Sequence, residues 1–315
     1  MTPTTRPAAG VHLPWAKVPA AVKEWAAGIG GGEPTGVRDL HGGFSPGAAA
    51  WLECPRGAVF VKAVGEELNT ESPALHRREA VVSGALPRLP AFPVLLDVYD
   101  QGGWVALAFD AIDGRVPRHP WDRAELDRVV KALEDVHRAL TPSPAAHLEP
   151  ARLFFQKLFG GWAELASAKD TSGLDPWCWK NLSRLAELEA RWPEAIDGQT
   201  LVHGDIRSDN ILISQAGPVF VDWPHAAVGT PVFDLIAWAP SVVLEGGPRP
   251  EELLAAHGPS RSADPDIVSV LLAAVSGFFV ARSLRPSPPG LPTLRPFQAA
   301  QGEVALAWLR HRTAW

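Results

Sequence analysis

Alternating apolar and polar positions in the first third of the chain predict a small β-sheet. A helix is expected at 14–28 before the first strand, and a second at 73–86 between the third and fourth strands. Glycine- and proline-containing turns separate several runs in which apolar residues recur at every second position. These runs predict strands at 35–41, 48–53, 58–64, 94–99 and 104–109. The order predicts an antiparallel sheet with one helix inserted between its strands.

From residue 111 onward, apolar residues recur at spacings of three and four, which is typical of helices. The strongest pattern covers 122–140, where Asp122 is expected to cap the first turn. Two short apolar runs, 200–202 and 218–221, interrupt the helices and are expected to be neighbouring strands. Further helices are expected at 150–166, 176–190, 231–239, 267–284 and 293–311. The length and this change of pattern predict two domains, 1–110 and 111–315.

The loop between the two short runs holds a dense group of polar side chains. Asp222 follows the second run, and the loop itself carries His203, Asp205, Arg207, Asp209 and Asn210. Neighbouring strand ends should bring Asp205, Asn210 and Asp222 close together. A carboxylate that accepts a hydroxyl proton, with an amide and a second carboxylate that bind a divalent cation, suits phosphoryl transfer from a magnesium nucleotide. The competing interpretation is an ordinary hairpin with a polar loop.

The order His203-Gly204-Asp205, then Asn210, then Asp222 resembles the Brenner-type motif of the aminoglycoside phosphotransferase and choline kinase family. These proteins are small-molecule relatives of the protein kinases, which carry His-Arg-Asp and Asp-Phe-Gly at the corresponding places. Gly204 and Trp223 are departures typical of the small-molecule branch. The resemblance covers about residues 35 to 240. It implies a bilobal protein kinase-like α+β fold, with a small antiparallel-sheet N-lobe that has one helix and a mainly helical C-lobe.

The resemblance also implies roles for residues of the loop. Asp205 would accept or orient the proton of the substrate hydroxyl group. Asn210 and Asp222 would bind Mg²⁺ through oxygen atoms. His203 and Asp234 would support the loop structurally rather than take part in the chemistry.

Arg207 and two neighbouring residues concern the transferred phosphate and the acceptor. Arg207 would stabilise charge on the γ-phosphoryl group, or it would pair with Asp209 at the surface. Asp209 and Trp223 are candidates for lining the acceptor pocket. The alternative for Trp223 is a place in the core, where aromatic residues are more often found. An arginine excess near the C-terminus weighs against a polycationic acceptor: Arg282, Arg285, Arg295, Arg310 and Arg312 stand against Glu303.

In the first domain, the resemblance points to a nucleotide site. Lys62 interrupts an apolar strand and would contact the α- and β-phosphates while pairing with Glu79 on the following helix. Glu66, Glu67 and Glu71 are weaker partners, and a solvent-facing lysine on an edge strand is the alternative. The other candidates are Gly43 and Ser45 in a nucleotide-covering loop, and Phe109 and Ala111 at the adenine edge. A glycine hairpin and a plain interdomain connection would produce similar sequences.

Composition narrows the classes of partner. The net charge of −6 and the pI of 5.9 give no basic surface for nucleic acid. Two cysteines form neither a disulfide framework nor a zinc set. The N-terminus has no apolar signal region, and the longest apolar run, 267–281, is shorter than the ~20 residues of a membrane helix. A cytoplasmic protein is expected, with no membrane or nucleic-acid partner and no evident obligate protein partner.

The predicted function is an ATP- and Mg²⁺-dependent phosphotransferase that acts on a hydroxyl group of a small molecule, such as an aminoglycoside, another antibiotic or a metabolite. Two alternatives remain open. One is a metabolic kinase of the same fold, for choline, homoserine, a sugar or a nucleoside. The other is a catalytically silent nucleotide-binding module. The sequence leaves open the acceptor, ATP or GTP as donor, the oligomeric state, and a role in resistance, biosynthesis or primary metabolism.

Overall fold

The computed structural model describes residues 12–40, 46–145, 147–170, 172–288 and 291–315. Within these ranges, the chain forms two compact units. The sheet unit comprises 12–116 and 209–225, and the helical unit comprises 117–208 and 226–315. The first unit thus includes a segment from late in the chain. A lobe boundary after residue 110 stays a prediction.

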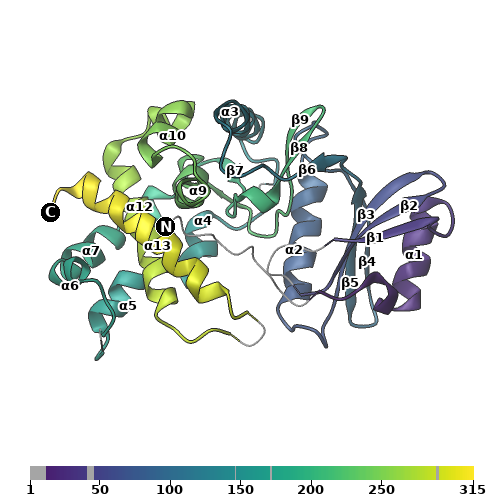
Figure 1. Cartoon of the computed structure of the whole chain (residues 1–315), viewed down its shortest axis with the longest axis horizontal. Coiled ribbons are helices and arrows are strands. Elements are labelled where there is room, and N and C mark those ends of the chain that lie inside the picture. The colour runs from purple at the N-terminus through teal and green to yellow at the C-terminus, as the bar shows by residue number, and fades with distance from the viewer. Residues whose placement is uncertain (1–11, 41–45, 146, 171, 289–290) are drawn as a thin grey trace. The chain divides into compact units, whose positions relative to one another are not determined.

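A five-stranded antiparallel sheet forms the centre of the sheet unit (Figure 1). Its strand order is β1-β2-β3-β5-β4, so the fourth strand lies at an edge. The strands are β1 (Gly36–Asp39), β2 (Ala48–Cys54), β3 (Gly57–Gly65), β4 (Leu95–Gln101) and β5 (Trp104–Asp110). All five predicted strands are present. Buried and less buried residues alternate along β2 and along most of β3, whereas β5 is buried on both faces and β1 and β4 have no fully buried residue.

Two helices cover opposite faces of this sheet (Figure 1). On one face, α1 (Ala20–Gly30) packs on a hydrophobic cluster to which β3 contributes Val59, Val61 and Ala63. Since alternate side chains of a strand point to opposite faces, Lys62 points to the other face, where α2 (Ser72–Ala85) lies. The strand thus directs one lysine toward a helix that carries a glutamate.

Two smaller sheets correct the prediction that 200–202 and 218–221 are neighbouring strands. In the helical unit, β7 (Thr200–Val202) pairs with β10 (Ala227–Gly229). In the sheet unit, β9 (Gly217–Phe220) pairs with β8 (Ile211–Ser214), which also pairs with β6 (Gly114–Arg115). The apolar run Ile-Leu-Ile at 211–213 is itself a strand, and Gly217 at φ 121° closes its tight turn to β9.

The helical unit contains most of the helices of the chain. Gly160, at φ 104°, and Asn181 break the two helices predicted at 150–166 and 176–190. Asp122 caps α3 as predicted, by accepting a hydrogen bond from the Glu125 N–H at 2.8 Å. The helices are α3 (Arg123–Ala139), α4 (Ala151–Phe154), α5 (Gly161–Ser167), α6 (Pro176–Lys180), α7 (Leu182–Glu189), α8 (Trp192–Ala195), α9 (Val232–Leu244), α10 (Pro250–Ala256), α11 (Gly258–Arg261), α12 (Pro265–Ser283) and α13 (Leu294–Thr313).

Among the described residues, α12 alone is long and apolar enough to cross a membrane by length and composition. Its most apolar window is 56% buried inside the protein. Within the helical unit it packs against α5, α7, α9 and α13. These contacts are those of a core helix.

Candidate functional site

Lys62 joins two carboxylates that are distant in the sequence. Its Nζ donates a hydrogen bond to Asp222 Oδ1 at 2.7 Å and forms an ion pair with Glu79. The predicted pairing with Glu79 is therefore present. Glu66 instead lies 3.8 Å from the Arg77 guanidinium. The strand-to-helix return between β3 and α2 accounts for this choice, because it places Glu79 over the face to which Lys62 points.

The local electrostatics keep Lys62 charged. Burial alone would lower its pKa, but the negative charges of Asp222 and Glu79 outweigh burial and raise the pKa. Burial also raises the pKa of the Glu79 carboxyl, while the adjacent ammonium group opposes that rise. The ring of Phe109 lies 5.9 Å from Nζ and presents its face to the cation. The result is a fixed positive charge beside a half-exposed carboxylate.

His76 is a neighbour of this group that the sequence reasoning missed. It lies on α2 three residues before Glu79 and is buried. Its Nδ1–H donates to the Ser72 carbonyl oxygen at 3.0 Å. Burial first, and the Lys62 charge second, lower the pKa of His76 to about 4, so the ring is neutral at pH 7. The spacing of three residues, which places both side chains on one helix face, was the available signal.

Asn210 and Asp222 stand at the same end of the β8–β9 hairpin. Ile211 pairs with Phe220, and the Val221 N–H donates to the Asn210 carbonyl oxygen at 3.0 Å. Asp222 adopts φ 67°, in the left-handed region that side chains with a Cβ rarely occupy. Such backbone outliers concentrate at functional sites, where surrounding contacts maintain them.

Trp223 lies in the interior, contrary to its predicted place in an acceptor pocket. Its side chain is 1% exposed, and its Nε1 donates to the Phe220 carbonyl oxygen at 2.9 Å. The ring packs edge-on against Phe92, with centroids 5.5 Å apart. An acceptor cannot reach a side chain that is enclosed in this way, so Trp223 is part of the core of the sheet unit.

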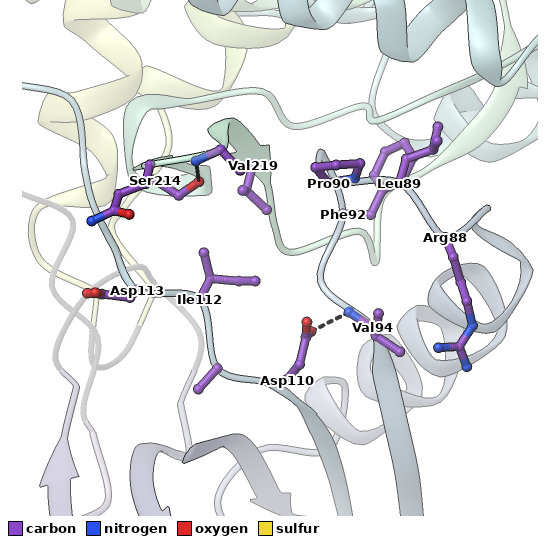
Figure 2. Close-up of a pocket in the computed structure, with 13 residues that line it drawn as sticks. Arg88, Leu89, Pro90, Phe92, Val94, Asp110, Ile112, Asp113, Ser214 and Val219 are labelled. Carbon is purple, nitrogen blue, oxygen red and sulfur yellow. Dashed lines mark hydrogen bonds between the residues drawn. The ribbon is translucent and has the colours of Figure 1, made fainter. Parts of the chain in front are cut away.

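A pocket of about 490 Å³ opens in the sheet unit beside the segment that follows β5 (Figure 2). The predicted adenine-edge residue Ala111 lines it, together with Asp110 and Ile112, and Asp110 accepts a hydrogen bond from the Val94 N–H. Sequence reasoning missed the other walls, because they come from two remote segments: Arg88, Leu89, Pro90, Phe92 and Val94, and Ser214, Gln215, Ala216 and Val219. Gly43 and Ser45 lie outside the described residues.

In the helical unit, Asp234 supports the loop that carries Asp205. Asp234 is buried and accepts hydrogen bonds from the His203 N–H at 2.9 Å and the Gly204 N–H at 2.8 Å. The Asp205 N–H in turn donates to His203 Nδ1 at 3.3 Å. Burial alone would raise the pKa of Asp234, but its hydrogen bonds and the neighbouring histidines lower it. These contacts match the supporting role predicted for His203 and Asp234.

Arg207 is close to Asp205 within the same loop. Its Nη1 lies 3.9 Å from Asp205 Oδ2, and its guanidinium carbon lies 5.7 Å from the centre of the Phe297 ring. Asp209 is exposed, and its predicted pairing with Arg207 stays a prediction. The first observation places a cation beside the carboxylate that the sequence marks as the base.

Glu245 is a further residue that the sequence did not reveal. Ser208, which follows Arg207, donates through its hydroxyl group to Glu245 Oε2. Trp121 Nε1 donates to the same oxygen at 3.0 Å. Glu245 therefore links the end of the loop to the segment before α3, through contacts that no sequence spacing indicates.

Comparisons with known proteins agree with this fold. A model described as the phosphotransferase enzyme family matches residues 51–266. A spectinomycin phosphotransferase in complex with ADP and spectinomycin is 14% identical, with 91% of this chain and 97% of that chain covered and a TM-score of 0.61. A choline kinase from Streptococcus pneumoniae is also 14% identical, with 92% and 98% covered and a TM-score of 0.60. A choline/ethanolamine kinase family protein from Mesorhizobium loti is 17% identical, with 88% of each chain covered and a TM-score of 0.53. No curated protein sequence matches the chain. The likenesses confirm the predicted kinase-like α+β fold.

Proposed function

Because the chain belongs to the phosphotransferase enzyme family, we propose that it transfers the γ-phosphoryl group of Mg-ATP to a hydroxyl group of a small molecule. The observation that carries the proposal is the contact of Lys62 with both Asp222 and Glu79. A buried lysine held by a helix glutamate, beside a carboxylate at a strand end, is the set that positions a nucleotide triphosphate in kinases.

The donor atoms at the hairpin end fit Mg²⁺. Asp222 offers a carboxylate that is 38% exposed, and Asn210 offers an amide oxygen at the same end of the hairpin. Mg²⁺ typically takes one or two carboxylates together with substrate phosphates, so a larger cage of acidic residues is unnecessary. When bound, the ion would neutralise charge on the phosphate oxygens. Asn210 and Asp222 would hold it.

The remaining roles belong to side chains of the two units. Lys62 would bind the α- and β-phosphates, and Glu79 would orient it. Asp205 would take the proton of the acceptor hydroxyl group, a contribution typically worth ~10²–10⁴ in rate. Arg207, beside Asp205, would stabilise the charge of the group in transfer.

The pocket beside residues 110–113 suits the nucleotide base. Its walls combine apolar side chains with polar ones such as Arg88 and Asp113, and the backbone segment that follows β5 lies along one side (Figure 2). The spectinomycin phosphotransferase of similar fold was solved with ADP, which favours ATP as the donor over GTP. A cytoplasmic location, where ATP is made, fits this assignment.

The acceptor is proposed to be a small molecule, an antibiotic or a metabolite, rather than nucleic acid or protein. Relatives of similar fold act on spectinomycin and on choline. The arginine excess near the C-terminus no longer argues against a cationic acceptor, because three of these arginines are paired with carboxylates. The pairs are Arg285–Glu164, Arg310–Asp175 and Arg312–Glu251. Aminoglycosides and amino alcohols therefore belong in the acceptor screen beside sugars and nucleosides.

A screen of hydroxyl-bearing compounds tests the proposal. The purified protein is incubated with Mg-ATP and each compound, ADP formation is followed, and the phosphorylated product is identified by mass spectrometry. Asp205→Asn should abolish product formation, whereas Asp197→Asn, which alters an exposed carboxylate paired with Arg152, should not. Failure of every compound class to yield a product would leave the silent nucleotide-binding alternative in its place.

A further inference from the structure

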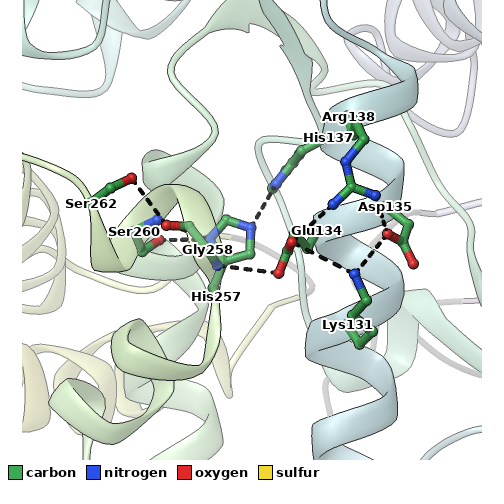
Figure 3. A network of polar contacts seen from close by, with 9 residues as sticks. All are labelled: Lys131, Glu134, Asp135, His137, Arg138, His257, Gly258, Ser260 and Ser262. Carbon is green, nitrogen blue, oxygen red and sulfur yellow. Dashed lines mark hydrogen bonds and ion pairs between the residues drawn. The ribbon is translucent and has the colours of Figure 1, made fainter.

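Asp234 ends a line of four buried polar side chains in the helical unit. Its Oδ2 lies 2.9 Å from His137 Nε2 on α3. His137 Nδ1 lies 3.1 Å from His257 Nε2, and His257 Nδ1 lies 2.7 Å from the Ser260 hydroxyl oxygen. Figure 3 shows His257 between His137 and Ser260. The line thus runs from the segment after α10, through α3, to the carboxylate that holds the backbone of the catalytic loop.

The direction of every proton in this line follows from one backbone group. The Ser260 N–H lies 3.3 Å from His257 Nδ1, and a backbone N–H can only donate. His257 Nδ1 therefore accepts, which puts the ring proton on Nε2. That proton points at His137 Nδ1, so His137 Nδ1 must also accept, and the proton of His137 lies on Nε2, facing Asp234.

The same geometry disfavours a proton on His137 Nδ1. A second proton on His137 would sit on Nδ1 and face the Nε2–H of His257, so two donors would oppose each other at 3.1 Å. Burial of both rings removes the water that could relieve such a clash. Asp234 consequently accepts from His137 Nε2 through Oδ2, and its two oxygens also accept from the His203 and Gly204 N–H groups.

His257 is itself firmly held. It directly precedes α11, and the N–H of the next residue, Gly258, donates to Glu134 Oε2 on α3 at 3.2 Å. Arg138 contacts the other oxygen of Glu134 at 2.9 Å, and Lys131 lies 3.6 Å from that same oxygen (Figure 3). His257 and His137 are therefore anchored to the same helix.

We propose that His257 is a positioning residue for phosphoryl transfer: by donating from Nε2 it fixes the tautomer of His137, which holds Asp234 against the backbone of the loop that carries Asp205. This inference rests on the proposed function only in so far as Asp205 acts in catalysis. His257 touches neither substrate nor nucleotide in this scheme, and its effect passes through His137 and Asp234.

Three substitutions at one position separate this role from simple packing. In His257→Gln, the amide N–H can occupy the place of Nε2 and donate to His137. In His257→Asn, the shorter amide reaches only the place of Nδ1, and His257→Leu has no donor. We expect kcat to fall about 10- to 100-fold in the Asn and Leu variants, with the KM for ATP little changed, and to stay within about threefold in the Gln variant. The control is Ser276→Val, which removes a buried hydroxyl group bonded to Trp162 and the Ala273 carbonyl oxygen rather than to the loop.

A second readout works without any turnover. Hydrogen exchange of the His203 and Gly204 amides should be faster in His257→Asn and His257→Leu than in His257→Gln, and NMR of the ring nitrogens should find both histidines protonated at Nε2. If the wild-type protein transfers no phosphate, the proposed function fails and this readout still decides the inference. Equal kcat and equal amide exchange in all three variants, or losses that merely follow melting temperature as in Ser276→Val, would overturn it.

Discussion

Lys62 Nζ lies 2.7 Å from Asp222 Oδ1 although 160 residues separate them in the chain. The lysine comes from the centre of a five-stranded sheet, and the aspartate follows the last strand of a separate hairpin in the same unit. Glu79 completes the group from α2. A cation is thereby placed between a buried carboxylate and one that solvent can reach, which is the arrangement from which the proposed nucleotide chemistry follows.

The left-handed backbone of Asp222 predicts an unusual order of stability among its variants. A side chain with a Cβ costs roughly 1–2 kcal/mol at positive φ, whereas glycine does not bear this cost. Asp222→Gly should therefore be more stable than Asp222→Ala by roughly 1 kcal/mol in urea unfolding, although both lose the carboxylate and the phosphotransfer activity. An alanine variant as stable as the glycine variant would contradict a strained backbone at this position.

The Lys62–Glu79 pair predicts strong coupling in a double-mutant cycle. Lys62→Met leaves the Glu79 carboxylate buried without its cation, which should lower the free energy of unfolding by about 3–5 kcal/mol, less where the carboxyl takes up a proton. Lys62→Met combined with Glu79→Leu should restore most of the free energy of unfolding. It should restore none of the activity, because the lysine that would contact the phosphates is still missing. Arg77→Ala, which breaks an exposed pair with Asp100, serves as the control and should change stability far less. Additive losses in the double variant would show that the two side chains do not interact.

Arg207 predicts a loss in kcat rather than in KM. If its guanidinium group stabilises charge in the transition state, Arg207→Ala should lower kcat about 10²-fold while the KM for ATP changes little. Arg207→Lys should recover part of the loss, since it restores charge but not the planar group. Arg285→Ala, at a cation paired with Glu164, is the matched control. A change under twofold in Arg207→Ala would remove this residue from the mechanism.

His257 predicts a stability that falls on acidification. Burial is the main cause that lowers the pKa of His257 to about 3; His137 adds to this lowering, and Glu134 and Asp234 oppose it. A histidine in the unfolded chain titrates near ~6.5. Between these values the unfolded chain binds a proton that the folded chain does not, so the free energy of unfolding decreases as pH falls. Between pH 6 and 4, the free energy of unfolding of the wild type should fall more steeply than that of His257→Gln, by a difference that approaches about 1.4 kcal/mol per pH unit. His76 contributes its own slope, equally in both proteins, so parallel curves would contradict the burial of a neutral His257.

Local periodicity was sufficient for the sheet and for the order of its elements. Alternate burial along β2 and β3 matches the alternation that predicted them, whereas β5 is buried on both faces and is a continuous apolar run. The return through α2 identified Glu79 as the partner of Lys62. The loop residues could be proposed as a site because the five-residue spacing from Asp205 to Asn210 is local; their roles stay predictions. Each of these features depends on neighbours in sequence, which a single chain displays directly.

Other features of the site depend on contacts that leave no local pattern. The β7–β10 pairing involves three-residue strands too short to alternate. His137 and His257 are 120 residues apart in the sequence. Nothing in the sequence around either residue shows that it belongs to a line of buried polar side chains rather than being an isolated core histidine. Trp223 is enclosed partly by Phe92, a residue that comes from the other sequence segment of the same unit. Tertiary packing decided these cases, and composition or spacing could not.

The rate of phosphoryl transfer to an acceptor found in the screen, measured by phosphorus NMR for the wild type and Asp205→Asn with Mg²⁺ or with EDTA, tests the central claim most directly. The wild type with Mg²⁺ should form product rapidly, and no product should form in EDTA. Asp205→Asn with Mg²⁺ should lose at least about 10²-fold in rate at an unchanged affinity for ATP. Product formed at similar rates by Asp205→Asn, or by the wild type in EDTA, would contradict the claim.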